Sequence, residues 1–406
     1  MQDNEKKPAL RFKGFTDPWE QRKLGDITVE LSEYATQELG LPLLTSSRSG
    51  LMYQDEYRDS RTTKSTETLF SVVPVGTCTY RHMSDDDVFH MNINTLEKGL
   101  VSREYPVFEA SKGNNLEFLV QHINSSEEFK AFCAEQKKGG TRTRLYYNTL
   151  CQFTVRVPAL KEQAQISQCL KKLDTLITLH QRKYEKLVNI KKSMLDKMFP
   201  KNGASVPEIR FKGFTDPWEQ RKLEEYLEVS GQKNFEGIYT KEDVLSVSGD
   251  FGIVNQIEFQ GRSFAGASVA NYGVVETGDI VYTKSPLKSN PYGIIKANKG
   301  KNGIVSTLYA VYKPKQSANP EFVQIYFEQD ARMNNYMHPL VNKGAKNDMK
   351  VSAENALKGQ IVFPDIKEQR TISEFFRNLD TLITLHQRKL EKLQNIKKSC
   401  LEKMFV

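Results

Sequence analysis

Basic side chains gather in three stretches of this sequence, and two of the three contain no acidic residue. The first runs from residue 136 to residue 161 and contains Lys137, Lys138, Arg142, Arg144, Arg156 and Lys161. The second runs from residue 280 to residue 320 and contains Lys284, Lys288, Lys296, Lys299, Lys301, Lys313 and Lys315. The third has the sequence NKGAKNDMK and contains Asn342, Lys343, Lys346, Asn347 and Lys350.

These residue types suit contacts with nucleic acid. Lysine and arginine attract phosphates, whereas arginine, asparagine and glutamine can also pair with the edges of bases. The sequence therefore predicts DNA-binding roles for Lys137, Lys138, Arg142, Arg144, Lys284, Lys288, Asn342, Lys343, Lys346 and Asn347. The alternative is that these stretches are ordinary solvated loops, with acidic partners elsewhere in the fold.

The net charge of the two segments that contain the basic stretches does not by itself indicate DNA binding. The chain carries 58 basic and 50 acidic residues over 406 positions, which gives a formal charge of +8. Residues 25–156 hold 14 basic and 18 acidic side chains, and residues 224–362 hold 15 of each. Neither segment is basic overall, so contact with DNA has to depend on local clusters.

Motifs for catalysis are missing from the sequence. It has no phosphate-binding loop of the form G-x-x-x-x-G-K-[ST], no H-E-x-x-H pair and no serine hydrolase signature. The five cysteines form no C-x-x-C pair. We predict no catalytic, cofactor-binding or metal-binding residue in this chain.

The elements that would position the basic stretches occur twice. Residues 11–24 read RFKGFTDPWEQRKL, and residues 210–223 repeat the same letters. The sequence LDTLITLHQRK occurs at residues 173–183 and again at residues 379–389. Between the repeats, GLVS at residues 99–102 and GIVS at residues 303–306 suggest one strand in a shared fold.

Two long helices are predicted, after Pro158 and after Pro364. Their apolar residues alternate at spacings of four and three, which is a heptad pattern that requires a partner helix. The predicted seam consists of Ile166, Leu170, Leu173, Ile177, His180, Tyr184, Leu187, Ile372, Phe376, Leu379, Ile383, His386, Leu390 and Leu393. The two histidines are interpreted as polar residues that fix the register, because neither has a metal-ligand partner at suitable spacing.

The repeated FTDPWEQ motif predicts a helix start. Thr16 or Asp17 would cap the helix, Pro18 would take its first position and Glu20 would complete a capping box. Phe12, Phe15 and Trp19 would then anchor the turn, as would Phe211, Phe214 and Trp218 in the second copy.

Composition indicates a soluble chain. Hydrophobic residues make up 38% and charged residues 27% of the sequence. No apolar run approaches the roughly 18 residues of a membrane span, and the polar start of the chain lacks a secretory signal. The odd number of cysteines favours reduced thiols, so we expect a cytoplasmic protein.

This arrangement resembles the specificity subunit of type I restriction-modification enzymes. The resemblance rests on Trp19-Glu20 and Leu24-Gly25-Asp26-Ile27, on Trp218-Glu219 and Leu223, and on the KEQ and LD motifs at residues 161–163, 173–174, 367–369 and 379–380. The second copy departs from the pattern, with Glu224-Glu225-Tyr226 where the first has Gly25-Asp26-Ile27.

The resemblance implies a fold and an organisation. The fold would be α+β, with two mixed α/β target-recognition domains and two long helices pairing as an antiparallel coiled coil in a pseudo-two-fold repeat. The segments would be a leading repeat at 1–24, recognition domain 1 at 25–157, spacer helix 1 at 158–200, a second leading repeat at 201–223, recognition domain 2 at 224–362 and spacer helix 2 at 363–406.

The resemblance also implies a function. Each recognition domain would read one half of a bipartite site in double-stranded DNA. Two modification subunits would methylate adenine at N6 with S-adenosylmethionine, and restriction subunits would add translocation and cleavage that depend on ATP and Mg²⁺. This chain would itself be non-catalytic and would not bind a membrane.

Two other classes remain open from the residues alone. A self-sufficient DNA methyltransferase or nuclease is opposed by the missing motifs. A coiled-coil scaffold without DNA contact is opposed by the divergent segments between near-identical repeats, which a scaffold does not need.

Overall fold

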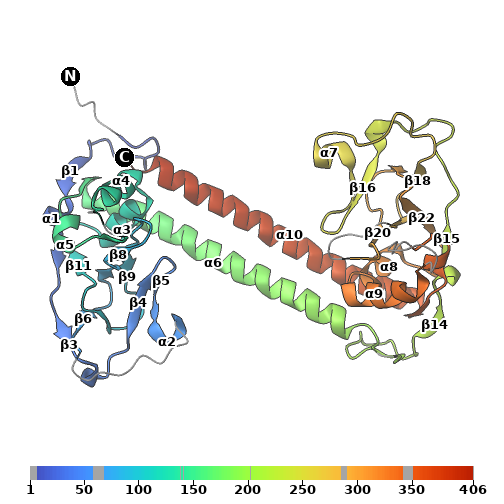
Figure 1. The fold of residues 1–406 in the computed structure, drawn as a ribbon, viewed down its shortest axis with the longest axis horizontal. Coiled ribbons are helices and arrows are strands. Elements are labelled where there is room, and N and C mark those ends of the chain that lie inside the picture. Colours follow the sequence, from blue (N-terminus) through green and yellow to red (C-terminus); the bar gives the residue numbers. More distant parts are fainter. Residues whose placement is uncertain are drawn as a thin grey trace. The chain divides into compact units, whose positions relative to one another are not determined.

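The protein is described from a computed structural model, which places residues 7–57, 68–137, 139, 141–201, 203–284, 290–341 and 351–405. The chain divides into two compact units. Unit 1 comprises residues 1–181 and 388–406, and unit 2 comprises residues 182–387. Each unit thus contains one leading repeat, one of the segments 25–157 and 224–362 and part of both long helices (Figure 1). These two segments are called recognition regions below, after the expectation from sequence.

Unit 1 combines small antiparallel sheets with helices. Its strands are β1 (Glu20–Lys23), β2 (Thr28–Glu30), β3 (Tyr34–Ala35), β4 (Leu44–Ser47), β5 (Gly50–Tyr53), β6 (Phe70–Val73), β7 (Cys78–Thr79), β8 (Met83–Ser84), β9 (Asn92–Ile93), β10 (Gly99–Ser102), β11 (Val107–Ala110), β12 (Thr143–Arg144) and β13 (Thr154–Val157). Its helices are α1 (Leu24–Ile27), α2 (Gln54–Tyr57), α3 (Leu116–Ser125), α4 (Glu127–Glu135), α5 (Tyr147–Leu150) and the first part of α6 (Leu160–Lys197), with a 3₁₀ turn η1 (Gln37–Leu39). The central sheet has the strand order β2-β11-β7-β9.

Unit 2 has the same plan. Its strands are β14 (Glu219–Lys222), β15 (Leu227–Val229), β16 (Leu245–Ser248), β17 (Gly252–Asn255), β18 (Gly273–Val275), β19 (Ile280–Thr283), β20 (Ile295–Ala297), β21 (Gly303–Val305), β22 (Tyr309–Pro314) and β23 (Gln360–Phe363). Its helices are α7 (Gln256–Gln260), α8 (Pro320–Tyr326), α9 (Asp330–Met337) and the first part of α10 (Ile366–Lys403). Its 3₁₀ turns are η2 (Leu223–Glu225), η3 (Lys241–Asp243), η4 (His338–Leu340) and η5 (Asn355–Leu357).

The strand registers show that both recognition regions have one fold. The central sheet of unit 2 has the order β15-β22-β19-β20, which matches that of unit 1 strand for strand. Phe108 pairs with Cys78 in unit 1, and Tyr312 pairs with Ile280 at the equivalent place in unit 2. The predicted mixed fold of helices and strands is therefore present twice.

The glycine shared by the GLVS and GIVS motifs is explained by the close approach of a neighbouring segment in each unit. Gly99 begins β10, and a Cβ atom there would lie 2.5 Å from Leu44 Cδ1. Gly303 begins β21, and its Cβ atom would lie 2.5 Å from the backbone oxygen of Asp243 and 2.8 Å from Leu245 Cγ. In both units, the neighbouring segment approaches too closely for a side chain at this position.

We therefore expect Gly303→Ala to lower the free energy of unfolding of unit 2 by about 1–3 kcal/mol, because the backbone of Asp243 must move to admit a methyl group. Chemical denaturation measures the effect. Gly300→Ala is the matched control, since the nearest atom to a Cβ there is 3.7 Å away. Equal stabilities of the two variants would contradict the steric explanation.

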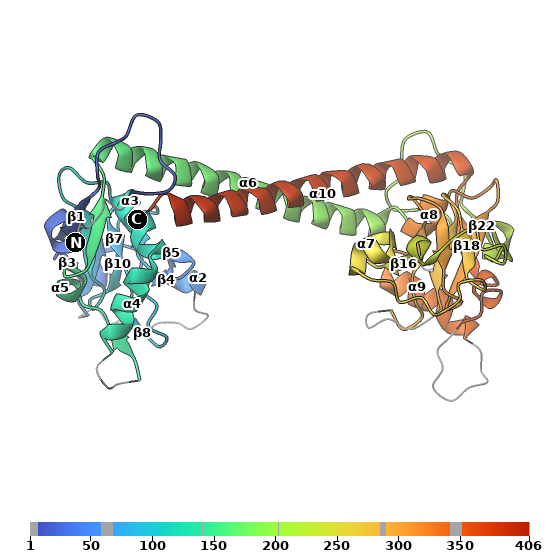
Figure 2. The same cartoon turned by 90° about the horizontal axis from the view of Figure 1, so that it is seen from above.

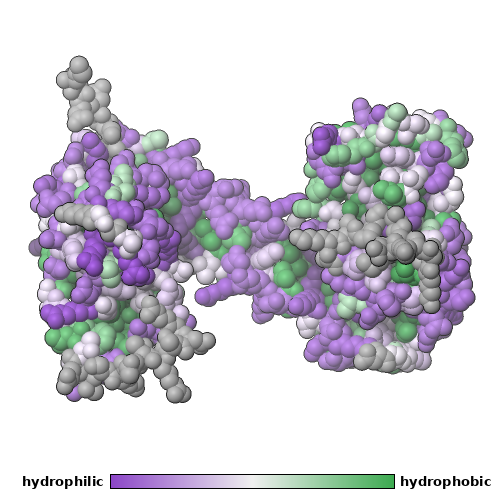
Figure 3. All heavy atoms as spheres, viewed as in Figure 1, coloured by the Kyte–Doolittle hydropathy of each residue, from purple (hydrophilic) through white to green (hydrophobic). Residues whose placement is uncertain are grey.

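The two long helices agree with the heptad pattern. Each contains 38 residues and is about 57 Å long at 1.5 Å per residue. All the predicted seam residues are buried or half-buried. The face of the helices seen in Figure 3 is mostly hydrophilic, with apolar patches along it. Among the described residues, no helix combines the length and apolarity needed to cross a membrane.

Within each unit the helices pair antiparallel, because the start of one contacts the end of the other. In unit 1, Lys397 of α10 lies 2.5 Å from Asp174 of α6. In unit 2, Lys191 of α6 lies 2.8 Å from Asp380 of α10. These ion pairs occupy equivalent positions of the repeat, so the same contact is made in both units.

The helix ends also complete the two cores. In unit 1, Cys400 and Met404 from the end of α10 are buried with residues of the recognition region. In unit 2, Leu195, Met198 and Phe199 from the end of α6 do the same. Each recognition region therefore needs the end of the helix that starts in the other unit.

The predicted helix start at FTDPWEQ is wrong. Residues 20–23 and 219–222 form strands β1 and β14, which pair with β13 and β23. Backbone pairing with a distant strand outweighs the local capping preference of Thr16, Asp17 and Pro18. Four of the six predicted aromatic anchors agree with the structure, because Trp19 and Trp218 are buried and Phe12 and Phe211 pack against the same cores. Phe15 and Phe214 are half-buried and do not belong to these core clusters.

A buried ion pair joins each leading repeat to its helix. Arg11 donates to both carboxylate oxygens of Glu162, at 2.7 and 2.8 Å, and Arg210 donates to both oxygens of Glu368, at 2.8 and 2.7 Å. Hydrogen bonding to Glu368 raises the pKa of Arg210 despite its partial burial. These pairs fix the first turn of each long helix against the repeat.

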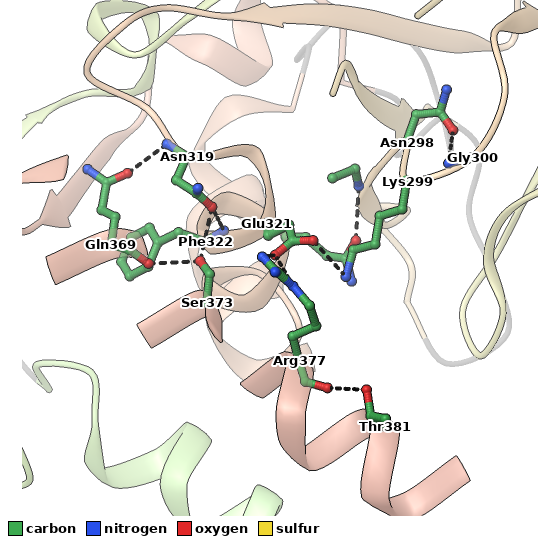
Figure 4. A network of polar contacts seen from close by, with 12 residues as sticks. Asn298, Lys299, Gly300, Asn319, Glu321, Phe322, Gln369, Ser373, Arg377 and Thr381 are labelled. Atoms are coloured by element: carbon green, nitrogen blue, oxygen red, sulfur yellow. Dashed lines mark hydrogen bonds and ion pairs between the residues drawn. The ribbon is translucent and has the colours of Figure 1, made fainter. Parts of the chain in front are cut away.

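The glutamine after each of these glutamates holds a shorter helix that precedes the long helix in the chain. Gln369 accepts a hydrogen bond from the backbone N–H of Asn319 at 2.9 Å, and Ser373 donates to the Asn319 side chain at 3.0 Å (Figure 4). Gln163 accepts from the backbone N–H of Asn115 at 2.9 Å in unit 1. Since Asn115 and Asn319 cap α3 and α8, the KEQ motifs position these helices.

Candidate nucleic-acid interface

Three of the predicted DNA-binding residues lie together at one end of unit 1. Lys137 follows α4, and Arg142 and Arg144 lie at strand β12, which pairs with β8. Figure 2 shows β8 and the end of α4 on the side of unit 1 that is remote from α6. Lys138 lies outside the described residues.

Three consecutive aspartates, Asp85, Asp86 and Asp87, form an acidic triplet, and two of them contact this basic loop. Arg142 Nε lies 2.6 Å from Asp85 Oδ1, and Lys137 Nζ lies 3.6 Å from Asp87 Oδ2. The hydroxyl of Thr143 also donates to Asp87. Asp87 has φ of 63°, the left-handed region, and is the one non-glycine residue there among those the structure describes. The loop is thus held by acidic residues that lie about 50 positions earlier in the chain.

A second arginine reaches the same triplet from the β4–β5 hairpin. Arg48 pairs with Asp86, and Ser84 donates to Asp86 at 2.8 Å. The hydrogen bond from Arg48, followed by that from Ser84, lowers the pKa of Asp86. A cavity of about 450 Å³ lies between this hairpin and residues 81–90, and Arg81 lines it. The sequence prediction missed Arg48 and Arg81, because isolated arginines carry no cluster signal.

A buried histidine lies between Arg81 and Met83, two residues that line this cavity. His82 is 2% exposed, lies 3.3 Å from Glu104 and stacks on Tyr146 with ring centroids 5.7 Å apart. Burial lowers the pKa of His82, the charges of Arg144 and Arg81 lower it further, and Glu104 opposes them. His82 is therefore neutral near pH 7, and the arginines around it carry the positive charge.

The equivalent position in unit 2 is occupied by Lys284. Lys284 directly follows β19, as His82 follows β7 in the matching register. The side chain is half-buried, and burial together with the charge of Lys233 lowers its pKa. The other predicted residues of unit 2 lie outside the described part of the chain: Lys288, Asn342, Lys343, Lys346 and Asn347.

The fold disperses the remaining lysines of the second basic stretch. Lys296 is buried on β20, and burial lowers its pKa. Lys299 lies 3.6 Å from Glu321, and Lys313 lies 2.9 Å from Asp279. A stretch without acidic residues in the sequence is therefore not a continuous basic surface in space.

Arg142 and Arg144 are each expected to contribute to DNA binding, through contact with either a phosphate or a base. Each alanine variant should weaken binding, and a residue that touches only phosphate should reduce the salt slope by about one unit without changing sequence preference. A residue that reads a base should cost about 1–3 kcal/mol at one position of the site. Fluorescence anisotropy of labelled duplex DNA at several salt concentrations measures both effects. Unchanged binding by both variants would make the loop an ordinary solvated surface.

Comparison with known proteins finds similarity to one family. The family model described as "Type I restriction modification DNA specificity domain" matches residues 90–189, from before β9 to within α6. Residues 90–189 are thus similar to the DNA specificity domain of type I restriction-modification systems. The matches give no support to the self-sufficient enzyme or to the scaffold without DNA contact.

The individual relatives of this chain are distant in sequence. The putative type I restriction enzyme MjaX specificity subunit of Methanocaldococcus jannaschii is 23% identical over 300 residues, covering 69% of this chain and 64% of the relative. The chain thus aligns with less than two thirds of that relative's length. The crystal structure of the type I restriction-modification S subunit from M. genitalium has a TM-score of 0.56 and 12% identity, and the match covers 98% of this chain and 99% of that one. The latter similarity shows the fold.

Proposed function

We propose that this chain is the DNA-recognition subunit of a type I restriction-modification complex, and that each unit reads one half of a bipartite site. The proposal rests on the observation that the two units share one fold but present different side chains on it. Both units share strand order, leading repeat and helix contacts. After the matching central strand, unit 1 has His82 and unit 2 has Lys284. Unit 1 also presents Arg48 and Arg142 paired with aspartates.

The repeated framework supports two equivalent partner positions. Under this proposal, two modification subunits bind the chain and methylate adenine with S-adenosylmethionine, while restriction subunits use ATP and Mg²⁺. All these cofactors belong to the partner subunits, and this chain contributes sequence recognition in the cytoplasm. The framework would place a methyltransferase near each half-site.

Exchange of one recognition region tests this proposal. Replacing residues 224–362 with the corresponding region of a relative should change one half of the methylated sequence and leave the other half intact. Methylome sequencing of cells carrying the chimera and the modification subunits gives both halves directly. The reciprocal exchange of residues 25–157 is the matched control and should change the other half. Changes in both halves from one exchange would overturn the independence of the units.

A further inference from the structure

The tip of the β4–β5 hairpin in unit 1 presents an arginine on a well-ordered turn. Ser47 pairs with Gly50 across the hairpin, so Arg48 and Ser49 form a two-residue turn between the strands. The hydroxyl of Ser47 donates to the Gly50 carbonyl at 3.0 Å and accepts from the backbone N–H of Ser49 at 3.1 Å. These two hydrogen bonds close the turn that carries Arg48.

The hairpin is also fixed to the central sheet of unit 1. Asn92 of β9 is buried, and its side-chain amide donates to the Ser46 hydroxyl and to the Ser47 carbonyl, each at 2.7 Å. The side-chain oxygen of Asn92 lies 3.1 Å from His90 Nδ1. The residue directly before Arg48 is therefore joined to the core of the unit.

The guanidinium end of the Arg48 side chain is held as well. Its Nη2 donates to both carboxylate oxygens of Asp86, and Asp86 Oδ1 also accepts from the hydroxyl of Ser84 at 2.8 Å. Ser84 is buried on β8, and its hydroxyl accepts from the backbone N–H of Val88 at 3.1 Å. Asp86 thus positions the guanidinium from a turn that is itself hydrogen-bonded.

Most of the donors of this guanidinium are left for another molecule. An arginine has five N–H groups, and Asp86 engages those of Nη2. Among the contacts of the described residues, none involves Nε or Nη1 of Arg48, and the side chain is 63% exposed. Guanine presents two acceptors, N7 and O6, on its major-groove edge, and a planar guanidinium matches this pair.

The neighbouring carboxylate favours a base over a phosphate as the partner of Arg48. A phosphate is negatively charged, so Asp86 would repel it at this distance, whereas the edge of guanine is neutral. Attraction of phosphates also needs no fixed geometry, while base readout requires a side chain that is held in place. A two-stranded β-ribbon such as β4–β5 fits the major groove of DNA. The support on both sides of Arg48 is therefore suited to base readout.

Unit 2 carries different residues at the equivalent hairpin tip. Equivalent parallel bridges join Leu43 to Leu100 in unit 1 and Val244 to Ile304 in unit 2, so β4–β5 and β16–β17 occupy matching places. The tip of β16–β17 consists of residues 249–251, which read Gly-Asp-Phe and contain no arginine. The two hairpins thus present different chemistry from one position of the shared fold.

We propose that Arg48 reads a guanine of the unit 1 half-site from the major groove, and that Asp86 positions its guanidinium for this contact. The inference rests on the proposed function, which supplies double-stranded DNA as the ligand. Arg48 donates to N7 and O6 of one guanine, and the contacts of the hairpin keep it opposite that base pair. The half-site of unit 1 therefore contains one G·C pair that is selected through Arg48.

Arg48→Ala should make this one position degenerate. Methylome sequencing of cells that carry the full chain and its modification subunits should show lost preference for G·C at one position of the unit 1 half-site. Binding to labelled duplexes that differ at this position gives the magnitude: the parent should prefer G·C to A·T by about 5- to 150-fold, and the variant by less than about 2-fold. The other positions, and the whole half-site of unit 2, should stay unchanged and so show that the variant is folded.

Asp86→Asn separates positioning from charge. Loss of a negative charge should strengthen binding to unrelated duplex DNA, because phosphates are no longer repelled. If Asp86 positions Arg48, the same variant should nevertheless lower the preference for G·C at the Arg48 position by about 3-fold or more. Arg22→Ala is the matched control, since Arg22 is an exposed arginine of unit 1 that pairs with Glu20, and it should leave every position of the site unchanged.

The outcomes are distinct. Loss of preference at one G·C position with Arg48→Ala, and not with Arg22→Ala, supports the proposal. Arg48→Ala overturns it by leaving all positions intact, by relaxing a position that is not G·C, or by weakening all duplexes equally. Full preference for G·C in Asp86→Asn overturns the positioning role of Asp86. A parent chain that shows no sequence preference with its modification subunits would instead refute the proposed function.

Discussion

Glu368→Gln should lower the free energy of unfolding of unit 2 by about 3–5 kcal/mol, because it leaves the charge of Arg210 without its carboxylate in a mostly buried place. Glu368 is fully buried, and the side chain of Arg210 is 13% exposed. Trp218 lies in the same core and reports on unit 2 alone in a Trp19→Phe background, since the chain has two tryptophans. Equilibrium denaturation followed by fluorescence measures the loss.

Two controls test whether the loss comes from the unpaired charge. The double variant Arg210→Met and Glu368→Leu removes both charges, so it should recover most of the lost stability. Glu321→Gln breaks the pairs with Arg377 and Lys299, whose side chains are 55% and 46% exposed, and should cost less than about 1 kcal/mol. An equal cost for Glu368→Gln and Glu321→Gln would show that burial of the first pair is unimportant.

The repeats made the helices predictable from sequence. Pro158, Pro200 and Pro364 limit them, and the observed helices begin and end within a few residues of these prolines. A heptad pattern is local information, since each seam position follows from residues three or four places away. What the pattern did not reveal is that the helix ends enter the cores, although the repeated KMF at residues 197–199 and 403–405 carries that signal.

The leading repeat and the basic stretches were harder to predict, for one common reason. The strand at residues 20–23 depends on a partner at residues 154–157. The capping preferences of neighbouring residues give no information about that distant partner. The charge of the loop around Arg142 likewise depends on Asp85, which is distant in sequence and 2.6 Å away in space. Non-local contacts of this kind decide whether a basic stretch forms a basic surface.

Lengthening both helices by one heptad should change the spacing between the two half-sites. The insertions belong after Gln181 in α6 and after Gln387 in α10, where each helix passes from one unit to the other. Seven residues keep the seam in phase and add about 10 Å, which corresponds to roughly three base pairs. Those base pairs also rotate the duplex by about a third of a turn, so affinity should fall even at the new spacing.

Methylation mapping of this variant should therefore give unchanged half-sites with a gap longer by about three base pairs, or no methylation. Insertion of three residues in both helices is the control, because it rotates the seam out of phase and should disrupt the pairing of α6 with α10. The original gap at full occupancy in the heptad variant would show that the helices do not set the spacing. In that case the flexibility of the recognition regions, and not helix length, would determine which DNA sites this chain selects.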